Sequence, residues 1–267
     1  MIMTKKDILA AFEELLDIMD ELRTKCPWDK EQTFESLRKL TIEETYELGD
    51  AVLRKDVQGI KNELGDLMLH IVFYAKIGSE NHDFNIGSVI QALNKKLITR
   101  HPHIYGDIEV RNAADVKKNW EEIKLREGTK SVLEGVPKSL PALVKANRIQ
   151  EKVRGVGFDW EHKNDIWAKV DEELSEIKKE LIKNQTNLNN DSQQGKIEAE
   201  FGDLFFTLIN AARLYKIDPE NALERTNQKF IKRFTFLEDK ASELGKLLKD
   251  MSLDEMDKIW EEAKRIE

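Results

Sequence analysis

An acidic pattern that occurs twice most constrains how this chain can fold. Each copy has the form Glu-Glu-x-x-Glu followed, further along, by Glu-x-x-Asp. The copies occupy residues 43–47 with 63–66 and residues 172–176 with 200–203. Acids three positions apart lie on one face of an α-helix, one turn from each other. Two neighbouring helices can therefore bring four carboxylates together, and such a concentration of like charge calls for a divalent cation.

Other blocks repeat in the same order as the acidic pattern. Residues 94–100 match 227–233. Residues 120–124 match 260–264, and both of these segments begin with Trp-Glu-Glu. Because chance similarity between acidic helices would not keep these blocks in order, we interpret the chain as a tandem duplication of one helical domain.

The boundary between the two halves is marked by helix-breaking residues. Gly128, Gly135, Pro137 and Pro141 all fall within a short stretch between the repeats. We therefore expect an N-terminal domain over residues 1–127, a linker over 128–140 and a C-terminal domain over 141–267.

Apolar residues at helical spacing predict helices throughout both halves. The charged fraction of 35% and the low counts of glycine (13) and proline (5) also favour an all-α fold with much solvated helix surface. The expected helices lie near 37–53, 60–75, 142–154, 170–181 and 201–209. The polar stretch 184–195 is rich in Asn and Gln, and we expect it to form a surface loop.

Composition argues against several classes of protein. The net charge of −8 is unlike that of a general nucleic-acid or membrane-surface binder, which would present a basic face. The chain contains no stretch of about 18 apolar residues, so we expect no membrane span. Cys26 is the single cysteine, which fits a reducing compartment. We therefore expect a cytoplasmic protein with neither a nucleic-acid nor a membrane partner.

Oxygen-only ligand sets favour Mg²⁺, or Mn²⁺ as its substitute. A di-iron bundle would instead carry Glu-x-x-His on two helices, and neither copy has that motif. His70 follows Asp66 by one helical turn, but a lone histidine on a mostly apolar helix is typical of a structural role. A single Glu-x-x-Glu would indicate only a solvated helix face, and the duplicated pairing is what favours a metal site.

The motifs together resemble those of a known family. Besides the acidic pattern, these are Cys-Pro-Trp-Asp at 26–29 with Gln-Thr at 32–33, the stretch 100–107, and 139–143 running to 156–160. The set is similar to the MazG-type members of the all-α nucleoside triphosphate pyrophosphohydrolases. The resemblance implies two tandem MazG-like helical-bundle domains that dimerise to complete four-helix sites, and Mg²⁺-dependent hydrolysis of nucleoside triphosphates to monophosphate and pyrophosphate.

The same resemblance implies roles for individual residues. The metal ligands would be Glu44, Glu47, Glu63 and Asp66 in the first half and Glu173, Glu176, Glu200 and Asp203 in the second. The nucleotide would contact Lys196, Asn210, Lys229, Arg233 and Trp260, with Lys96, Arg100 and Trp120 in the first half. The first acid of each motif, Glu43 or Glu172, is a candidate general base. Trp260 would either stack on a base or belong to the core.

The two halves differ around the acidic pattern. The second has Lys196 four positions before Glu200, whereas the first has Gly59 at the matching place. The second has Asn210 where the first has Phe73. Our hypothesis is that the second domain carries most of the activity, with broad base specificity. Two alternatives remain open: a narrow dUTP or dCTP diphosphatase, and a non-enzymatic helical scaffold that binds a protein partner.

Overall fold

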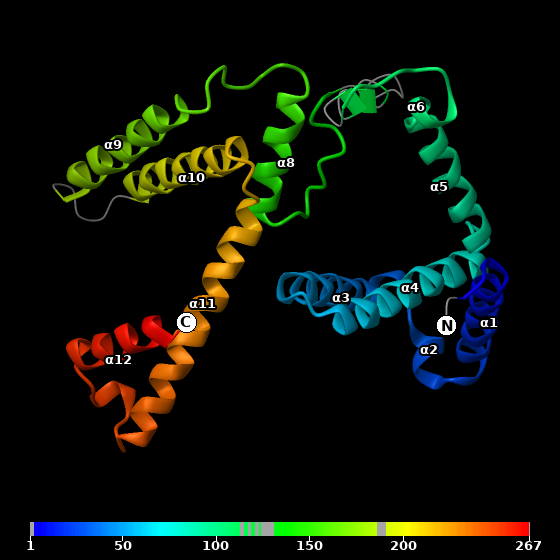
Figure 1. Cartoon of the computed structure of the whole chain (residues 1–267), viewed down its shortest axis with the longest axis horizontal. Coiled ribbons are helices and arrows are strands. Elements are labelled where there is room, and N and C mark those ends of the chain that lie inside the picture. Colours follow the sequence, from blue (N-terminus) through cyan, green and yellow to red (C-terminus); the bar gives the residue numbers. More distant parts are fainter. Residues whose placement is uncertain are drawn as a thin grey trace. The chain divides into compact units, whose positions relative to one another are not determined.

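A computed structural model describes residues 3–112, 115–116, 119–120, 123, 131–185 and 191–266. Over these residues it contains helices and no strand, which confirms the all-α expectation (Figure 1). The chain divides into two compact units, Met1–Val116 and Lys117–Glu267. The limits of the linker expected over 128–140 stay a prediction. Along the described helices, no apolar stretch reaches the length needed to span a lipid bilayer.

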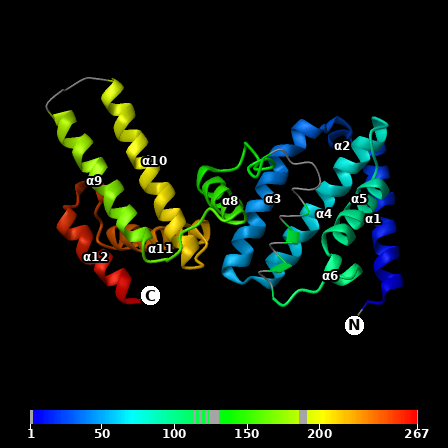
Figure 2. The same ribbon diagram turned by 90° about the horizontal axis from the view of Figure 1, so that it is seen from above.

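The first unit is built around the helix pair α3 and α4. Its helices are α1 Lys5–Lys25, α2 Pro27–Glu31, α3 Phe34–Arg54, α4 Val57–Glu80, α5 Ile86–Arg100 and α6 Pro102–Tyr105. Helices α3 and α4 lie side by side in both views (Figures 1 and 2). The short connection between them makes them antiparallel neighbours, as expected. Their core contains buried Met19, Leu37, Val72, Phe73 and Ile77.

Local residues set the ends of α3 and α4. Helix α3 begins at a capping box, in which the Thr33 backbone N–H donates to Ser36 Oγ over 2.9 Å and Ser36 N–H returns a bond to Thr33 Oγ1 over 3.2 Å. It ends where Lys55 takes a left-handed backbone conformation with φ of 57°. Asp56 then caps α4 by accepting from the Gly59 N–H. These residues end α3 after the first acidic segment and start α4 before the second, so that the two segments lie on adjacent helices.

The second unit contains two helix pairs and a connecting helix. Its helices are α8 Ala142–Arg154, α9 Ile166–Gln185, α10 Asp191–Leu214, α11 Pro219–Glu243, the 3₁₀ turn η1 Leu248–Asp250 and α12 Leu253–Ile266. Helix α9 packs along α10 through buried Val170, Ile177 and Leu204, and α12 packs on α11. Helix α8 contacts both α10 and α11. The expected helix over 142–154 is confirmed.

The loop expected over 184–195 is wrong for most of its length. Helix α9 continues to Gln185 and α10 already begins at Asp191, while residues 186–190 lie outside the described residues. The side chain of Gln193 donates to Glu180 Oε2 over 2.7 Å and thereby ties the first turn of α10 to α9. A tertiary bond of this kind extends helical structure into a polar segment whose composition alone predicts a loop.

Candidate metal and nucleotide site

Helices α9 and α10 bring three carboxylates together in the second unit. Oxygen atoms of Glu173, Glu200 and Asp203 all lie within 4.8 Å of one another. Glu173 is buried, with 4% of its surface exposed, whereas Asp203 is exposed. The spacing of the motif explains this convergence, because Glu200 and Asp203 share one face of α10 and that face meets α9.

The fourth predicted ligand of this cluster, Glu176, is not one of these three residues, but its charge acts on them. Burial raises the pKa of the Glu200 carboxyl, and the neighbouring charges of Glu176 and Asp203 raise it further. A carboxyl crowded by like charges in this way gains from a cation placed among them. The cluster is therefore electrostatically suited to a divalent ion.

The first unit has a matching cluster on α3 and α4. Oxygen atoms of Glu44, Glu63 and Asp66 again lie within 4.8 Å of one another. Burial raises the pKa of Glu44, and the charges of Asp66 and Glu47 add to that effect. The two units thus repeat the same carboxylate arrangement, as the duplicated pattern predicts.

A lysine that the sequence analysis did not single out lies on the second cluster. Lys169 Nζ is 2.9 Å from Glu173 Oε1 and 3.1 Å from Glu172 Oε2. These hydrogen bonds, the one with Glu173 first, raise the pKa of Lys169. The signal was present in the sequence, since a lysine four positions before a glutamate on a helix places the two side chains together.

The two candidate general bases are each paired with a lysine of their own helix. Glu172 meets Lys169 on α9, and Glu43 Oε1 lies 3.4 Å from Lys39 Nζ on α3. Both carboxylates are solvent-exposed. Neither belongs to the three carboxylates that converge in its unit.

A cationic and aromatic cluster forms on the other helix pair of the second unit. Arg233 of α11 lies over the Trp260 ring of α12, with 5.9 Å between Cζ and the ring centroid. The Phe230 ring packs against the same indole at a centroid distance of 5.0 Å. Lys229 is exposed one turn before Arg233. Trp260 is therefore half-buried against α11, and its ring also holds a cation.

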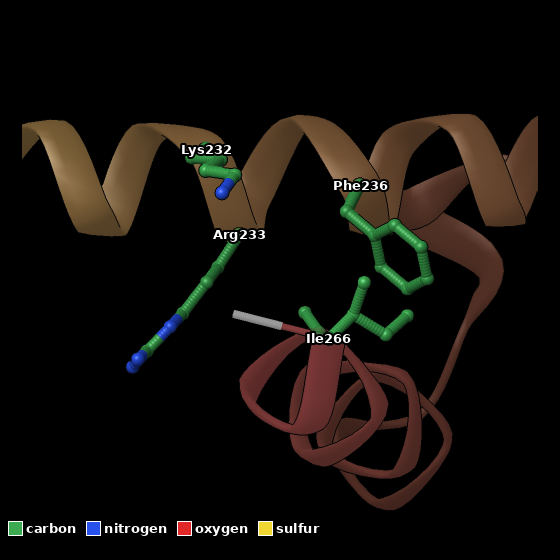
Figure 3. A pocket seen from close by; sticks show the side chains of 5 residues that line it. Lys232, Arg233, Phe236 and Ile266 are labelled. Carbon is green, nitrogen blue, oxygen red and sulfur yellow. The ribbon is translucent and has the colours of Figure 1, made fainter.

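A small pocket opens beside this cluster between α11 and α12. Its lining consists of Lys232, Arg233, Phe236, Ala263 and Ile266. In Figure 3 the side chains of Phe236 and Ile266 face each other, while the Arg233 side chain extends away from them. The guanidinium is thus presented at the edge of an apolar hollow.

The structure gives Asn210 a partner within its own helix. Asn210 Oδ1 accepts hydrogen bonds from Arg213 Nε over 3.0 Å and from Arg213 Nη2 over 2.7 Å. Arg213 also forms an ion pair with Asp159, in the loop between α8 and α9. The carbonyl oxygen of Asn210 therefore holds Arg213 in place.

The remaining nucleotide-binding candidates are Lys196 on α10, Lys96 and Arg100 on α5, and Trp120. Lys196 is exposed on α10, where its charge contributes to lowering the pKa of Glu180, mainly lowered by the hydrogen bond with Lys183. In the first unit Lys96 is exposed and Arg100 half-buried on α5. Trp120 lies beyond α6, and 38% of the residue is exposed.

A known domain family matches each of the two units. The model of the MazG nucleotide pyrophosphohydrolase domain matches twice, over residues 32–105 and 162–235. Each match contains one carboxylate cluster.

Relatives match almost the whole chain. The nucleoside triphosphate pyrophosphohydrolase/pyrophosphatase MazG of Thermotoga maritima is 40% identical over 95% of both chains. The nucleoside triphosphate pyrophosphohydrolase of Escherichia coli strain K12 is 38% identical over 96% of this chain and 97% of that protein. The uncharacterized protein YabN of Bacillus subtilis is 44% identical over 96% of this chain and 52% of its own length.

A solved structure also matches part of the chain. The crystal structure of a mazG-related protein from Thermotoga maritima has a TM-score of 0.38 and 26% sequence identity, over 42% of this chain and 98% of that one. The family assignment follows from the two domain matches and from the identity along nearly the full length. The chain belongs to the MazG family of nucleotide pyrophosphohydrolases, in the tandem form that carries the domain twice.

Proposed function

We propose that this protein hydrolyses nucleoside and deoxynucleoside triphosphates to the monophosphate and pyrophosphate, with Mg²⁺ as cofactor and with broad base specificity. The observation that carries the proposal is the carboxylate cluster on two packed helices, present in both units of a chain from this family. Mn²⁺ would substitute for Mg²⁺, because both ions prefer oxygen ligands.

The residues fit such an ion. Glu173, Glu200 and Asp203 offer carboxylate oxygens that all lie within 4.8 Å of one another, and Glu176 lies near enough to act on Glu200 by its charge. No nitrogen or sulfur ligand is needed. When bound, a divalent ion supplies neutralisation of phosphate oxygens and lowers the pKa of a coordinated water.

Protein side chains would remove a proton from the attacking water and bind the phosphates. Glu172, exposed beside the cluster, is placed to take a proton from the attacking water. Lys229 and Arg233 share one face of α11 and would bind the phosphates of the leaving pyrophosphate. Hydrolysis between the α- and β-phosphates then requires the carboxylate cluster and this cationic face to meet at one triphosphate.

We assign the main activity to the second unit. It has Lys196 four positions before Glu200, whereas the first unit has Gly59 at the matching place. Phe73, which stands opposite Asn210 in the repeat, is buried in the core of the first unit and offers no polar group. The first unit therefore keeps the carboxylates but has fewer groups for a triphosphate.

We further propose that the protein acts as a homodimer. Apolar side chains are exposed on α9, α10 and α11 of the second unit, and Phe205 is 60% exposed. These residues include Leu174, Leu181, Phe201, Phe205, Leu208, Phe230, Ile231 and Phe234. Because exposed apolar faces of this extent mark association surfaces, a second copy would cover them. It would also build a four-helix site from two helix pairs.

The test is pyrophosphate release by the full-length chain from a panel of common NTPs and dNTPs, with and without Mg²⁺. Asp203→Asn and Asp66→Asn remove one exposed ligand from the second and first cluster respectively, without emptying a buried position. Sedimentation velocity on the same samples gives the oligomeric state.

The proposal expects Mg²⁺-dependent release from many bases, lost with Asp203→Asn and largely kept with Asp66→Asn. Loss with Asp66→Asn alone would reverse the assignment of the two units. Release from dUTP or dCTP alone would favour the narrow diphosphatase. A folded dimer that releases no pyrophosphate from any substrate would contradict the enzymatic proposal.

A further inference from the structure

We infer that Lys169 is a resident counter-ion of the second cluster, which occupies Glu173 in the metal-free protein and is displaced when a divalent ion binds. The inference rests on the proposed metal-dependent function. It concerns a residue outside the acidic pattern, and it makes the metal affinity of the second unit depend on a lysine that the first unit lacks.

Burial makes Glu173 dependent on a cation. Its side chain is almost fully covered, and the Lys169 ammonium lies 2.9 Å from its Oε1. Transferring an ionised carboxylate from water into a covered site is costly unless a charge of opposite sign accompanies it. Lys169 supplies that charge from the same helix, one turn before Glu173.

A divalent ion and the lysine would compete for the same carboxylate. The ion would sit among the oxygens of Glu173, Glu200 and Asp203, all within 4.8 Å of one another. Two cations on one carboxylate repel each other strongly at this short distance. Metal binding therefore drives the ammonium away from Glu173.

The displaced ammonium has an alternative partner already in contact. Glu172 Oε2 lies 3.1 Å from Lys169 Nζ, and its carboxylate is exposed. The lysine can give up Glu173 while it keeps this second ion pair, so its displacement needs only a side-chain movement. Lys169 is thus a positioning residue that sets how readily the metal enters.

The first unit provides the natural contrast. Four positions before Glu44 the chain has Leu40, an apolar residue packed against the core that contains Met19 and Leu37. The carboxylates of the first cluster have no lysine at this place. The inference therefore predicts tighter binding of a bare divalent ion at the first cluster than at the second.

The experiment measures Mn²⁺ binding by calorimetry to the full-length chain carrying Asp66→Asn, so that the second cluster dominates the signal. In this background Lys169→Met removes the charge and keeps the length of the side chain. Lys178→Met is the matched control, because Lys178 lies about two and a half turns further along α9 and faces the opposite way. Asp203→Asn in the same background identifies the heat that belongs to the second cluster.

We expect Lys169→Met to bind Mn²⁺ about tenfold more tightly, since removing the competing ion pair is worth about 1.4 kcal/mol. Lys178→Met should bind as the parent does, and Lys169→Arg should keep the weaker affinity. A second readout is thermal unfolding without metal. Lys169→Met should lower the midpoint, because Glu173 loses its partner, and added Mn²⁺ should restore it to the parent value.

Unchanged or weaker Mn²⁺ binding by Lys169→Met, with binding by the parent intact, would overturn the inference and leave the proposed function standing. Equal tightening by Lys178→Met would also overturn it, because the effect would then belong to net charge. Absence of any heat that Asp203→Asn removes from the parent would overturn both proposals.

Discussion

Arg233 lies over the face of Trp260, so the aromatic ring of α12 fixes the direction of a guanidinium on α11. Phe230 packs against the same indole and keeps the ring in place. An arginine held in this way loses little side-chain freedom when it binds a phosphate. Under the proposed function, the tryptophan would therefore act by orienting Arg233, without contact with a base.

Replacing Trp260 should weaken substrate binding through Arg233. An exposed cation–π contact is worth about 0.5–1 kcal/mol, so Trp260→Leu should raise KM about two- to fivefold and change kcat little. Trp260→Phe keeps an aromatic face, so its KM should lie between that of the parent and that of Trp260→Leu. Steady-state pyrophosphate release measures both constants. A loss confined to one base, and larger in the Leu variant than in the Phe variant, would instead indicate stacking on that base.

Removing Asp159 should destabilise the second unit. Arg213 has 8% of its side chain exposed and would be left without its charged partner, which costs about 2 kcal/mol. Asp159→Ala should lower the free energy of unfolding by that amount in urea titrations. Arg154 touches the same carboxylate but has 65% of its side chain exposed, so Arg154→Ala should cost less than about 0.5 kcal/mol. Similar losses in the two variants would contradict this account.

The start of α12 should make stability depend on acid pH. Lys246 Nζ lies 2.6 Å from Glu255, and Ser252 N–H donates to the same carboxylate over 2.9 Å. These contacts lower the pKa of Glu255 from 4.5 to about 2. A lowered carboxyl pKa means that the unfolded chain binds the proton first, so the stabilisation is present above about pH 4.5 and is lost as the pH falls towards 2.

The measurement compares the thermal midpoints of the parent and Glu255→Gln from about pH 7 down to about pH 3. The parent should be more stable at neutral pH, and the difference should shrink as the pH falls. Glu262→Gln, an exposed acid on the same helix, serves as the control and should follow the parent at every pH. A difference that stays constant with pH would contradict the predicted role of Glu255.

Divalent ions should stabilise the metal-free protein. An ion that binds only the folded chain adds about 2.7 kcal/mol at a concentration one hundred times its Kd. Mg²⁺ should therefore raise the thermal midpoint, whereas NaCl at the same ionic strength should have a smaller effect. The double variant Asp66→Asn with Asp203→Asn should lose most of the specific increase. Equal stabilisation of the parent and this variant would place the effect outside the clusters.

Apolar periodicity was sufficient to predict most of the helices. The pair α3 and α4 follows from it, since the two helices bury apolar side chains against one core. The helix over 142–154 also forms as expected, although its buried residues are Gln150 and Lys152. The ends of the polar stretch, residues 184–185 and 191–195, were predicted wrongly as loop because the bond from Gln193 to Glu180 joins residues on two helices. Composition describes the preference of a segment, whereas a neighbouring helix decides its structure.

In the candidate site, too, local spacing predicts some contacts and not others. The convergence of Glu173, Glu200 and Asp203 follows from spacing on two helices, and so does the contact of Lys169 with Glu173. The pairing of Arg213 with Asp159 joins residues far apart in the chain, and no local pattern announces it. His70, expected to be structural, is buried, and burial lowers its pKa.

Lys152 of α8 has a consequence for any attempt to study the second unit by itself. Its ammonium is buried and donates to the carbonyl oxygens of Val132 and Glu134, each over 3.0 Å. A fragment that began at Pro141 would remove both acceptors and leave a charged group covered without a partner. Such a fragment would be weakened by the position of the cut, and its low activity would say little about the domain. A fragment should therefore begin before Ser131.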